Sequence, residues 1–140
     1  MSAVRNFAVF GEPVEVLVSG EMTKGVSATM MQMSPPGGGP PPHMHQNEDE
    51  TFFVVEGEYE FLAGDGWTRR SAGQSFYAAR GSVHTFRNAG SAEGKLLVMA
   101  TPAGLDTYLE EISVLSIPQD VPKLIAISER YGISFPSLSA

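Results

Sequence analysis

The chain has 140 residues, no cysteine, and 16 acidic against 9 basic side chains, which give a net charge of −7. The length fits one domain, and the 42% of hydrophobic residues is enough for one core. The negative charge argues against nucleic acid as a partner, and the lack of cysteine excludes disulfides and thiolate metal sites.

No segment resembles a targeting or membrane-spanning sequence. Residues 1–11 lack the basic stretch and long apolar run of a signal peptide, and no stretch approaches the roughly 20 apolar residues of a transmembrane helix. We therefore expect a cytoplasmic protein that does not bind membranes.

The first part of the chain predicts strands and a long loop. Residues 14–18 and 28–33 alternate loosely between apolar and polar side chains, as strands do. Residues 34–42 contain only serine, proline and glycine, and this composition prevents regular structure. The loop could be an interdomain linker, but the 33 residues before it are few for a separate domain. We expect a loop within one domain.

Several short strands are predicted after this loop. The first two share residues 50–62 and meet in a turn near Gly57, and the others span 67–70, 75–77, 83–87 and 95–100. Short strands separated by glycine-rich turns are typical of an antiparallel sandwich or barrel.

The pattern becomes helical after Pro102. Residues 105–114 and 122–130 contain no glycine and space their apolar side chains as helices do, and Gly132 fits a helix stop. We expect two short helices packed on the outside of an all-β barrel.

These elements predict a single domain over residues 1–140. Its barrel core would span about 12–102, and its C-terminal helical segment about 103–132.

All three histidines lie in two short windows. His43 and His45 are two residues apart, so on a strand they would point to one side, roughly 6–7 Å apart, and could bind one ion. Glu50 follows His45 by five residues, an odd spacing that requires the polar segment 46–49 to turn the chain. His84 is distant in sequence and could reach the others across a barrel.

Each of these features has a simpler alternative. A lone histidine is more often a surface or core residue than a ligand, and Glu48 and Asp49 could form a solvated acidic run beside Glu50. The full pattern, rather than any single residue, favours a metal site.

Two glycine-containing motifs surround the candidate ligands. The first runs from Gly37 through His43-Met44-His45 and Glu50 to Gly57. Its spacing is similar to that of the first motif of the cupin superfamily, in which glycine, His-X-His, glutamate and glycine follow one another.

The second motif resembles the other cupin motif, in which glycine, Pro-X-Gly, histidine and asparagine follow one another. It reads Gly73, Ala79-Arg80-Gly81, His84 and Asn88. Ala79 replaces the usual proline, a position in a turn that supplies no ligand.

The chain thus resembles small single-domain cupins of the quercetin dioxygenase-like kind. The resemblance implies a cupin jelly-roll β-barrel, frequent homodimerisation, and metal coordination by His43, His45, Glu50 and His84. Three imidazoles and one carboxylate suit Fe, Mn, Ni, Zn, Co or Cu better than calcium or magnesium.

An apolar pocket for a small molecule is expected beside the ion. The predicted lining residues are Met30, Phe52, Val54, Tyr59, Phe61 and Phe86. Plain core packing is the alternative for each of them.

The first functional hypothesis is a metal-dependent dioxygenase of an aromatic or enolisable substrate, with Glu50 as ligand and as acceptor of the substrate's proton. The alternatives are a non-oxidative isomerase, cyclase or lyase, and a small-ligand-binding cupin without turnover. Four arginines could anchor an acidic substrate or simply face solvent: Arg69, Arg70, Arg80 and Arg87.

Overall fold

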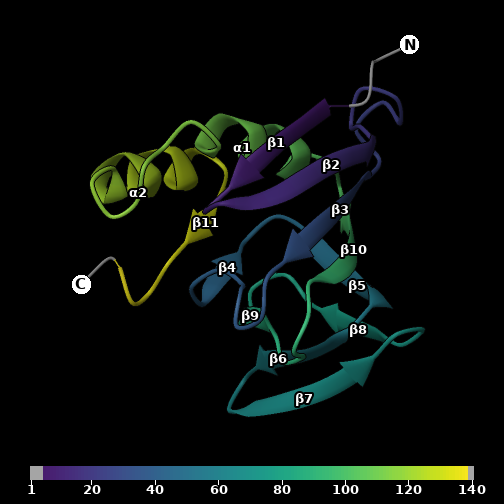
Figure 1. The fold of residues 1–140 in the computed structure, drawn as a ribbon. Helices are drawn as coiled ribbons and strands as arrows, with labels where there is room; N and C mark the ends of the chain where they lie inside the picture. The colour runs from purple at the N-terminus through teal and green to yellow at the C-terminus, as the bar shows by residue number, and fades with distance from the viewer. Residues whose placement is uncertain (1–4, 139–140) are drawn as a thin grey trace.

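The computed structural model describes residues 5–138 and contains two antiparallel sheets and two short helices (Figure 1). The six-stranded sheet consists, in spatial order, of β1 (Arg5–Val9), β2 (Glu12–Val18), β3 (Ala28–Ser34), β10 (Gly94–Thr101), β5 (Asp49–Glu56) and β8 (Ser75–Ala78). The five-stranded sheet consists of β11 (Ile133–Ser134), β4 (His43–His45), β9 (Val83–Asn88), β6 (Glu58–Ala63) and β7 (Gly66–Ser71). The prediction of a mostly β fold with short C-terminal helices is confirmed.

The core lies between the two sheets, because alternate residues of each strand point inward. On β5 the buried side chains are Glu50, Phe52 and Val54, while the residues between them point outward. The neighbouring strand β10 places Ala100, Val98 and Leu96 beside them in the same order. On these two strands the inner face therefore changes from polar at Glu50 to apolar at Val54 and Leu96.

Two strands lie outside the barrel core predicted at 12–102. β1 forms a hairpin with β2 around Phe10 and Gly11, both of which have positive φ (54° and 80°). A bulky residue rarely adopts this conformation, so the sequence around Phe10 did not indicate a hairpin turn. The short β11 pairs with β4 after the helices. The single-domain prediction also includes residues 1–4 and 139–140, which lie outside the described residues.

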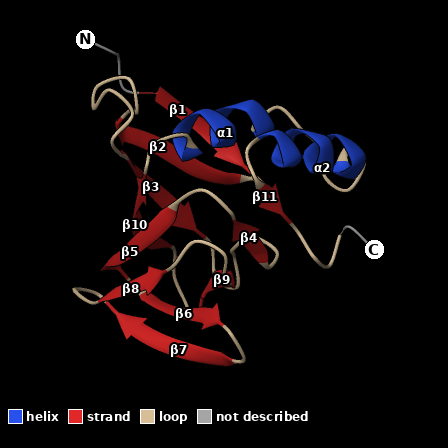
Figure 2. Cartoon of the chain, turned by 180° about the vertical axis from the view of Figure 1, so that it is seen from behind, coloured by secondary structure: helices blue, strands red, loops and turns tan. Residues whose placement is uncertain are grey.

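The helices α1 (Leu105–Ile112) and α2 (Val121–Arg130) lie close to the predicted ranges. Both cover the side of the molecule where β1 and β11 lie, as the views from front and back agree (Figure 2). The Arg5 guanidinium holds α1 against β1 through Asp106 (3.0 Å) and Glu110 (2.7 Å). Side chains of α1 also line a cavity together with residues of both sheets, so this helix does more than pack on the outer surface. Neither helix has the length and apolar character needed to cross a membrane.

Candidate metal centre

The two sheets bring all three histidines and Glu50 together at one end of the core. His43 and His45 point inward from β4, and the antiparallel pairing of β4 with β9 places His84 directly opposite His43. The ring centroids of His43 and His84 are 4.6 Å apart. The sequence suggested that His84 reaches the cluster from across the barrel. This is wrong, because His84 lies on β9, the strand next to β4.

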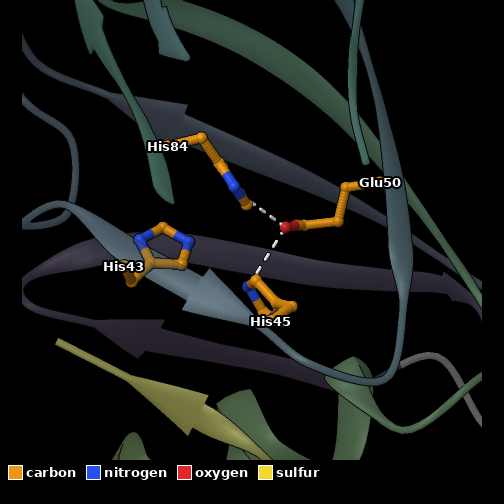
Figure 3. A group of neighbouring side chains, drawn as sticks. All are labelled: His43, His45, Glu50 and His84. Carbon is orange, nitrogen blue, oxygen red and sulfur yellow. Dashed lines mark hydrogen bonds and ion pairs between the residues drawn. The ribbon is translucent and has the colours of Figure 1, made fainter. Parts of the chain in front are cut away.

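Glu50 is the group that approaches from the opposite sheet. Residues 46–48 carry the chain from β4 in the five-stranded sheet to β5 in the six-stranded sheet, so these strands do not form a hairpin. This crossing accounts for the odd spacing after His45. One carboxylate oxygen, Glu50 Oε1, lies 3.0 Å from His45 Nε2 and 2.8 Å from His84 Nε2 (Figure 3).

The four side chains are buried and form a compact set of possible ligands. One ligand atom from each of His43, His45, Glu50 and His84 lies within 4.8 Å of all the others. The described residues thus contain a group that can hold a metal ion, at the positions that the sequence motifs indicated.

The outer nitrogen of each ring has its own partner. His43 Nδ1 lies 2.9 Å from the Pro41 carbonyl oxygen. His45 Nδ1 lies 2.6 Å from Glu48 Oε1, and His84 Nδ1 lies 3.1 Å from the Ser82 carbonyl oxygen. Carbonyl and carboxylate oxygens only accept hydrogen bonds, so in the neutral form of each ring Nδ1 carries the proton and Nε2 keeps its lone pair. Such outer partners hold metal-binding histidines in position in many sites.

Glu48 is a residue whose role the sequence did not reveal. Its side chain is 6% exposed and contacts His45, so it is not part of a solvated acidic run. Asp49, by contrast, faces the surface and pairs with Arg80. The spacing of Glu48 three residues after His45 is the sequence feature that could have suggested the contact.

These contacts fit a bound cation. A neutral imidazole donates from only one nitrogen, so His45 and His84 would direct Nε2 lone pairs at an ionised Glu50 oxygen. Lone pairs that face each other at 2.8–3.0 Å repel unless a proton or a metal ion lies between them. A nitrogen-rich set with one carboxylate suits a divalent transition metal.

The electrostatics differ among the ligands. Burial, reinforced by the nearby His45 and His84, lowers the pKa of His43 to about 3, so this ring is neutral. Burial opposes a charge on His45, but the carboxylates of Glu50 and Glu48 outweigh it and raise the pKa of His45. Burial likewise favours a neutral Glu50, but His45 and His84 outweigh it and lower the Glu50 pKa to about 2. Glu50 is therefore ionised and ready to coordinate.

A mainly apolar cavity of about 60 Å³ adjoins the cluster, with room for several water molecules. Of the predicted pocket residues, Met30, Phe52 and Phe86 line it. Val54, Tyr59 and Phe61 do not line it, although they also point inward. Val54 and Tyr59 lie further from the candidate ligands along the strands than Phe52 and Phe86 do. Phe61 lies beside Phe86 but stacks on Phe76, with ring centroids 4.8 Å apart.

The sequence did not identify the rest of the cavity wall. α1 contributes Leu105, Tyr108, Leu109 and Ile112, while Phe10 and Phe135 come from the β1–β2 turn and the C-terminal segment. The Phe135 ring lies 5.7 Å from the His43 ring, measured between centroids. These residues line the cavity only because α1 packs against β1 and β3 and because β11 pairs with β4.

None of the described residues that line the cavity is arginine or lysine. Arg69, Arg80 and Arg87 form ion pairs with carboxylates on the outside of the sheets, and Arg70 hydrogen-bonds a backbone carbonyl there. The possibility that one of the four arginines anchors an acidic substrate in this cavity is therefore not supported.

Comparisons with known proteins agree with this geometry. A family model described as "Cupin domain" matches residues 30–100. No curated protein is similar enough to count as a relative.

Several solved structures share the fold. A structure of KdgF from Halomonas sp. is 17% identical, with a TM-score of 0.64, over 76% of this chain and 91% of that one. A predicted oxalate decarboxylase from Thermotoga maritima is 23% identical, with a TM-score of 0.61, over 71% and 92% of the two chains. A sugar phosphate isomerase from Silicibacter pomeroyi is 23% identical, with a TM-score of 0.54, over 63% and 59%. None of these three is described as a dioxygenase, so the resemblance to quercetin dioxygenase-like cupins stays a prediction.

Removal of one ring should abolish stable metal binding. We expect His84→Ala to leave the purified protein with less than about a tenth of the wild-type metal content, because three ligands hold a transition metal far less tightly than four. Elemental analysis measures this directly. Val83→Ala changes an outward-facing neighbour on the same strand and serves as the control. Equal metal content in His84→Ala and wild type would remove His84 from the ligand set.

Metal affinity should depend on pH through His45. The pKa of His45 is raised, and below this pKa a metal ion must displace a proton from the ring. Metal affinity should therefore fall by about tenfold for each pH unit of acidification below the pKa. His43 and Glu50, with pKa values of about 3 and 2, stay deprotonated over this range. Calorimetric titrations with Co(II) between about pH 6 and 8 test this. An affinity that does not change with pH would show that His45 binds without losing a proton.

Proposed function

Because the chain belongs to the cupin family, we propose that it is a metal-dependent dioxygenase of a small aromatic or otherwise enolisable molecule. The observation that carries this proposal is the combination of four convergent candidate ligands with an apolar cavity that has no arginine or lysine among its described lining. A divalent transition metal bound there would supply positive charge for a deprotonated substrate oxygen and, if redox-active, electron transfer to dioxygen.

The cavity walls favour a flat apolar substrate. Phe52 and Phe86 approach the centre from opposite sheets, with ring centroids 5.7 Å apart, and Phe135 packs over His43. Aromatic walls of this kind bind ring faces and edges. The small volume favours a small substrate.

The same walls disfavour phosphorylated or strongly acidic substrates. A phosphate or a second carboxylate would have to leave water without an arginine or lysine to receive it. Tyr108 lines the cavity, but its hydroxyl is paired with Ser128 Oγ at 2.7 Å. The sugar phosphate isomerase and oxalate decarboxylase that share the fold therefore suggest less suitable substrate classes for this cavity.

Glu50 has two proposed roles, as metal ligand and as acceptor of the substrate's proton. The lowered pKa supports the first role, because the carboxylate is ionised at neutral pH. It opposes the second, because a carboxylate with so low a pKa is a weak base. Metal coordination is therefore the role that the site favours for Glu50.

The outer face of the six-stranded sheet supports a homodimer. Met31, Leu97 and Phe53 lie in one cross-strand row on β3, β10 and β5, and Phe53 is 39% exposed. Met99 and Tyr77 lie exposed in the next row, on either side of Thr51. A largely apolar surface of this kind is typical of an interface between protein chains.

Oxygen uptake separates the proposed reaction from its alternatives. Protein loaded with Fe(II), Ni(II) or Co(II) should consume dioxygen with small phenols or β-diketones, and Zn(II)-loaded protein and His84→Ala should not. An oxygen electrode measures this. Full-rate turnover without dioxygen would instead support an isomerase, cyclase or lyase, and binding without turnover a ligand-binding cupin.

The oligomeric state tests the proposed interface. Light scattering after gel filtration should give twice the chain mass of 15.0 kDa. Phe53→Arg should shift the protein to the monomer mass, because it places a charge in the apolar row. Val114→Arg, at an 82% exposed position after α1, is the control. A monomeric wild type would contradict the homodimer.

A further inference from the structure

Glu12 is a buried carboxylate that belongs neither to the metal cluster nor to the surface. It begins β2 and is 7% exposed. Glu12 Oε1 accepts hydrogen bonds from Ser34 Oγ at 2.8 Å and Gln32 Nε2 at 3.4 Å, and Oε2 accepts one from the Gly39 amide at 2.9 Å. The side chain thus joins β3 to the proline- and glycine-rich loop at residues 35–42.

This loop runs from Glu12 along β9 to the metal cluster. Asn88 exchanges backbone hydrogen bonds with it, accepting from the Gly37 amide (2.8 Å) and donating to the Gly38 carbonyl (2.9 Å). Thr85 Oγ1 donates to the Pro40 carbonyl at 2.6 Å. The next carbonyl, that of Pro41, is the partner of His43 Nδ1. The loop is therefore held on one side by β9 and on the other by Glu12.

The glycines allow this close approach. A Cβ atom at Gly38 would lie 2.8 Å from Glu12 Oε2, and one at Gly39 would lie 2.0 Å from the Phe86 carbonyl oxygen. Gly39 also has φ of 146°, a conformation that other residues rarely adopt. The backbone can thus pass between Glu12 and Phe86 only because these positions lack side chains.

A carboxylate suits this position better than its amide. A hydroxyl, a side-chain amide and a backbone amide all donate to Glu12, and a carboxylate accepts from all of them. Glutamine lacks the negative charge, and with its NH₂ group in the place of Oε2 it would face the Gly39 amide, which can only donate. With the NH₂ group in the place of Oε1, Ser34 would have to accept and the Gln32 amide would have to turn over. In either orientation the charge-assisted hydrogen bonds that hold the loop are weakened.

We propose that Glu12 is a positioning residue for the metal centre. By holding Gly39, it fixes the loop that presents the Pro41 carbonyl, and that carbonyl keeps His43 Nε2 directed toward His84 and Glu50. The inference rests on the metal site of the proposed function and adds a residue that acts on it from outside the ligand set.

Cobalt binding and cobalt absorption test the proposal. Co(II) is titrated into metal-free wild type, Glu12→Gln, Ser34→Ala and Asp106→Asn, and the visible spectrum of each complex reports the ligand geometry. Asp106 is the matched control, because it is 2% exposed and binds a backbone amide, that of Gly20, at 3.0 Å. Its contacts hold α1 and do not lead to His43.

Glu12→Gln should bind Co(II) about tenfold more weakly than wild type, at the lower end of the effect of outer partners on metal affinity. Its absorption spectrum should also change, because His43 no longer holds one orientation. Asp106→Asn should melt at a lower temperature but keep wild-type Co(II) affinity and spectrum. Ser34→Ala removes one donor and keeps the carboxylate, so it should fold and change affinity and spectrum in the same direction, by about threefold in affinity.

The outcomes separate this inference from the proposed function. Wild type that does not bind Co(II) would overturn the metal site and the role of Glu12 together. Wild type that binds, with Glu12→Gln matching it in affinity and spectrum, would overturn only the role of Glu12. If Glu12→Gln does not fold, wild-type affinity and spectrum in Ser34→Ala would overturn that role.

Discussion

The contact between one glutamate oxygen and two imidazoles joins the two halves of this protein. Glu50 comes from the six-stranded sheet, and His45 and His84 come from the five-stranded sheet. An ionised carboxylate and two ring nitrogens share a space from which water is largely excluded. In such a space these groups repel one another when nothing lies between them, and a proton or a metal cation between them turns the repulsion into attraction. The rest of the structure places these groups so closely that a cation is the simplest way to satisfy them all.

Holding such a cluster requires support beyond the ligands. Each imidazole is fixed at its outer nitrogen by a group from a loop: Pro41 before β4, Glu48 after it, and Ser82 before β9. Loops are usually the mobile parts of a fold, but these are tied to strands by further hydrogen bonds. The cluster is thus preorganised by loop geometry as well as by the inward alternation of the strands.

The cavity beside the cluster limits the chemistry more than the ligands do. Cupins with similar ligands can act on different molecules, because function depends on the site built on a fold. Here α1, Phe10 and Phe135 close a small apolar space whose described lining carries no permanent positive charge. Under the proposed function, the positive charge that balances a substrate's anionic oxygen would come from a bound metal, and the apolar walls would receive the rest of the molecule.

The sequence alone determined the candidate ligands and the general fold. His43, His45, Glu50 and His84 stand in two local motifs, and the alternation of apolar residues indicated the strands, because both depend on neighbours along the chain. Only the tertiary structure decided that His84 lies beside His43, that Glu50 crosses between sheets, and which inward-facing residues line the cavity. Phe52 and Phe61 share the same inward orientation, but only Phe52 lies where the packing leaves space. Contacts between segments that are distant in the sequence decide the strand order, the register and the position of α1 over the sheets. The pattern of neighbouring residues along the chain does not reveal these contacts.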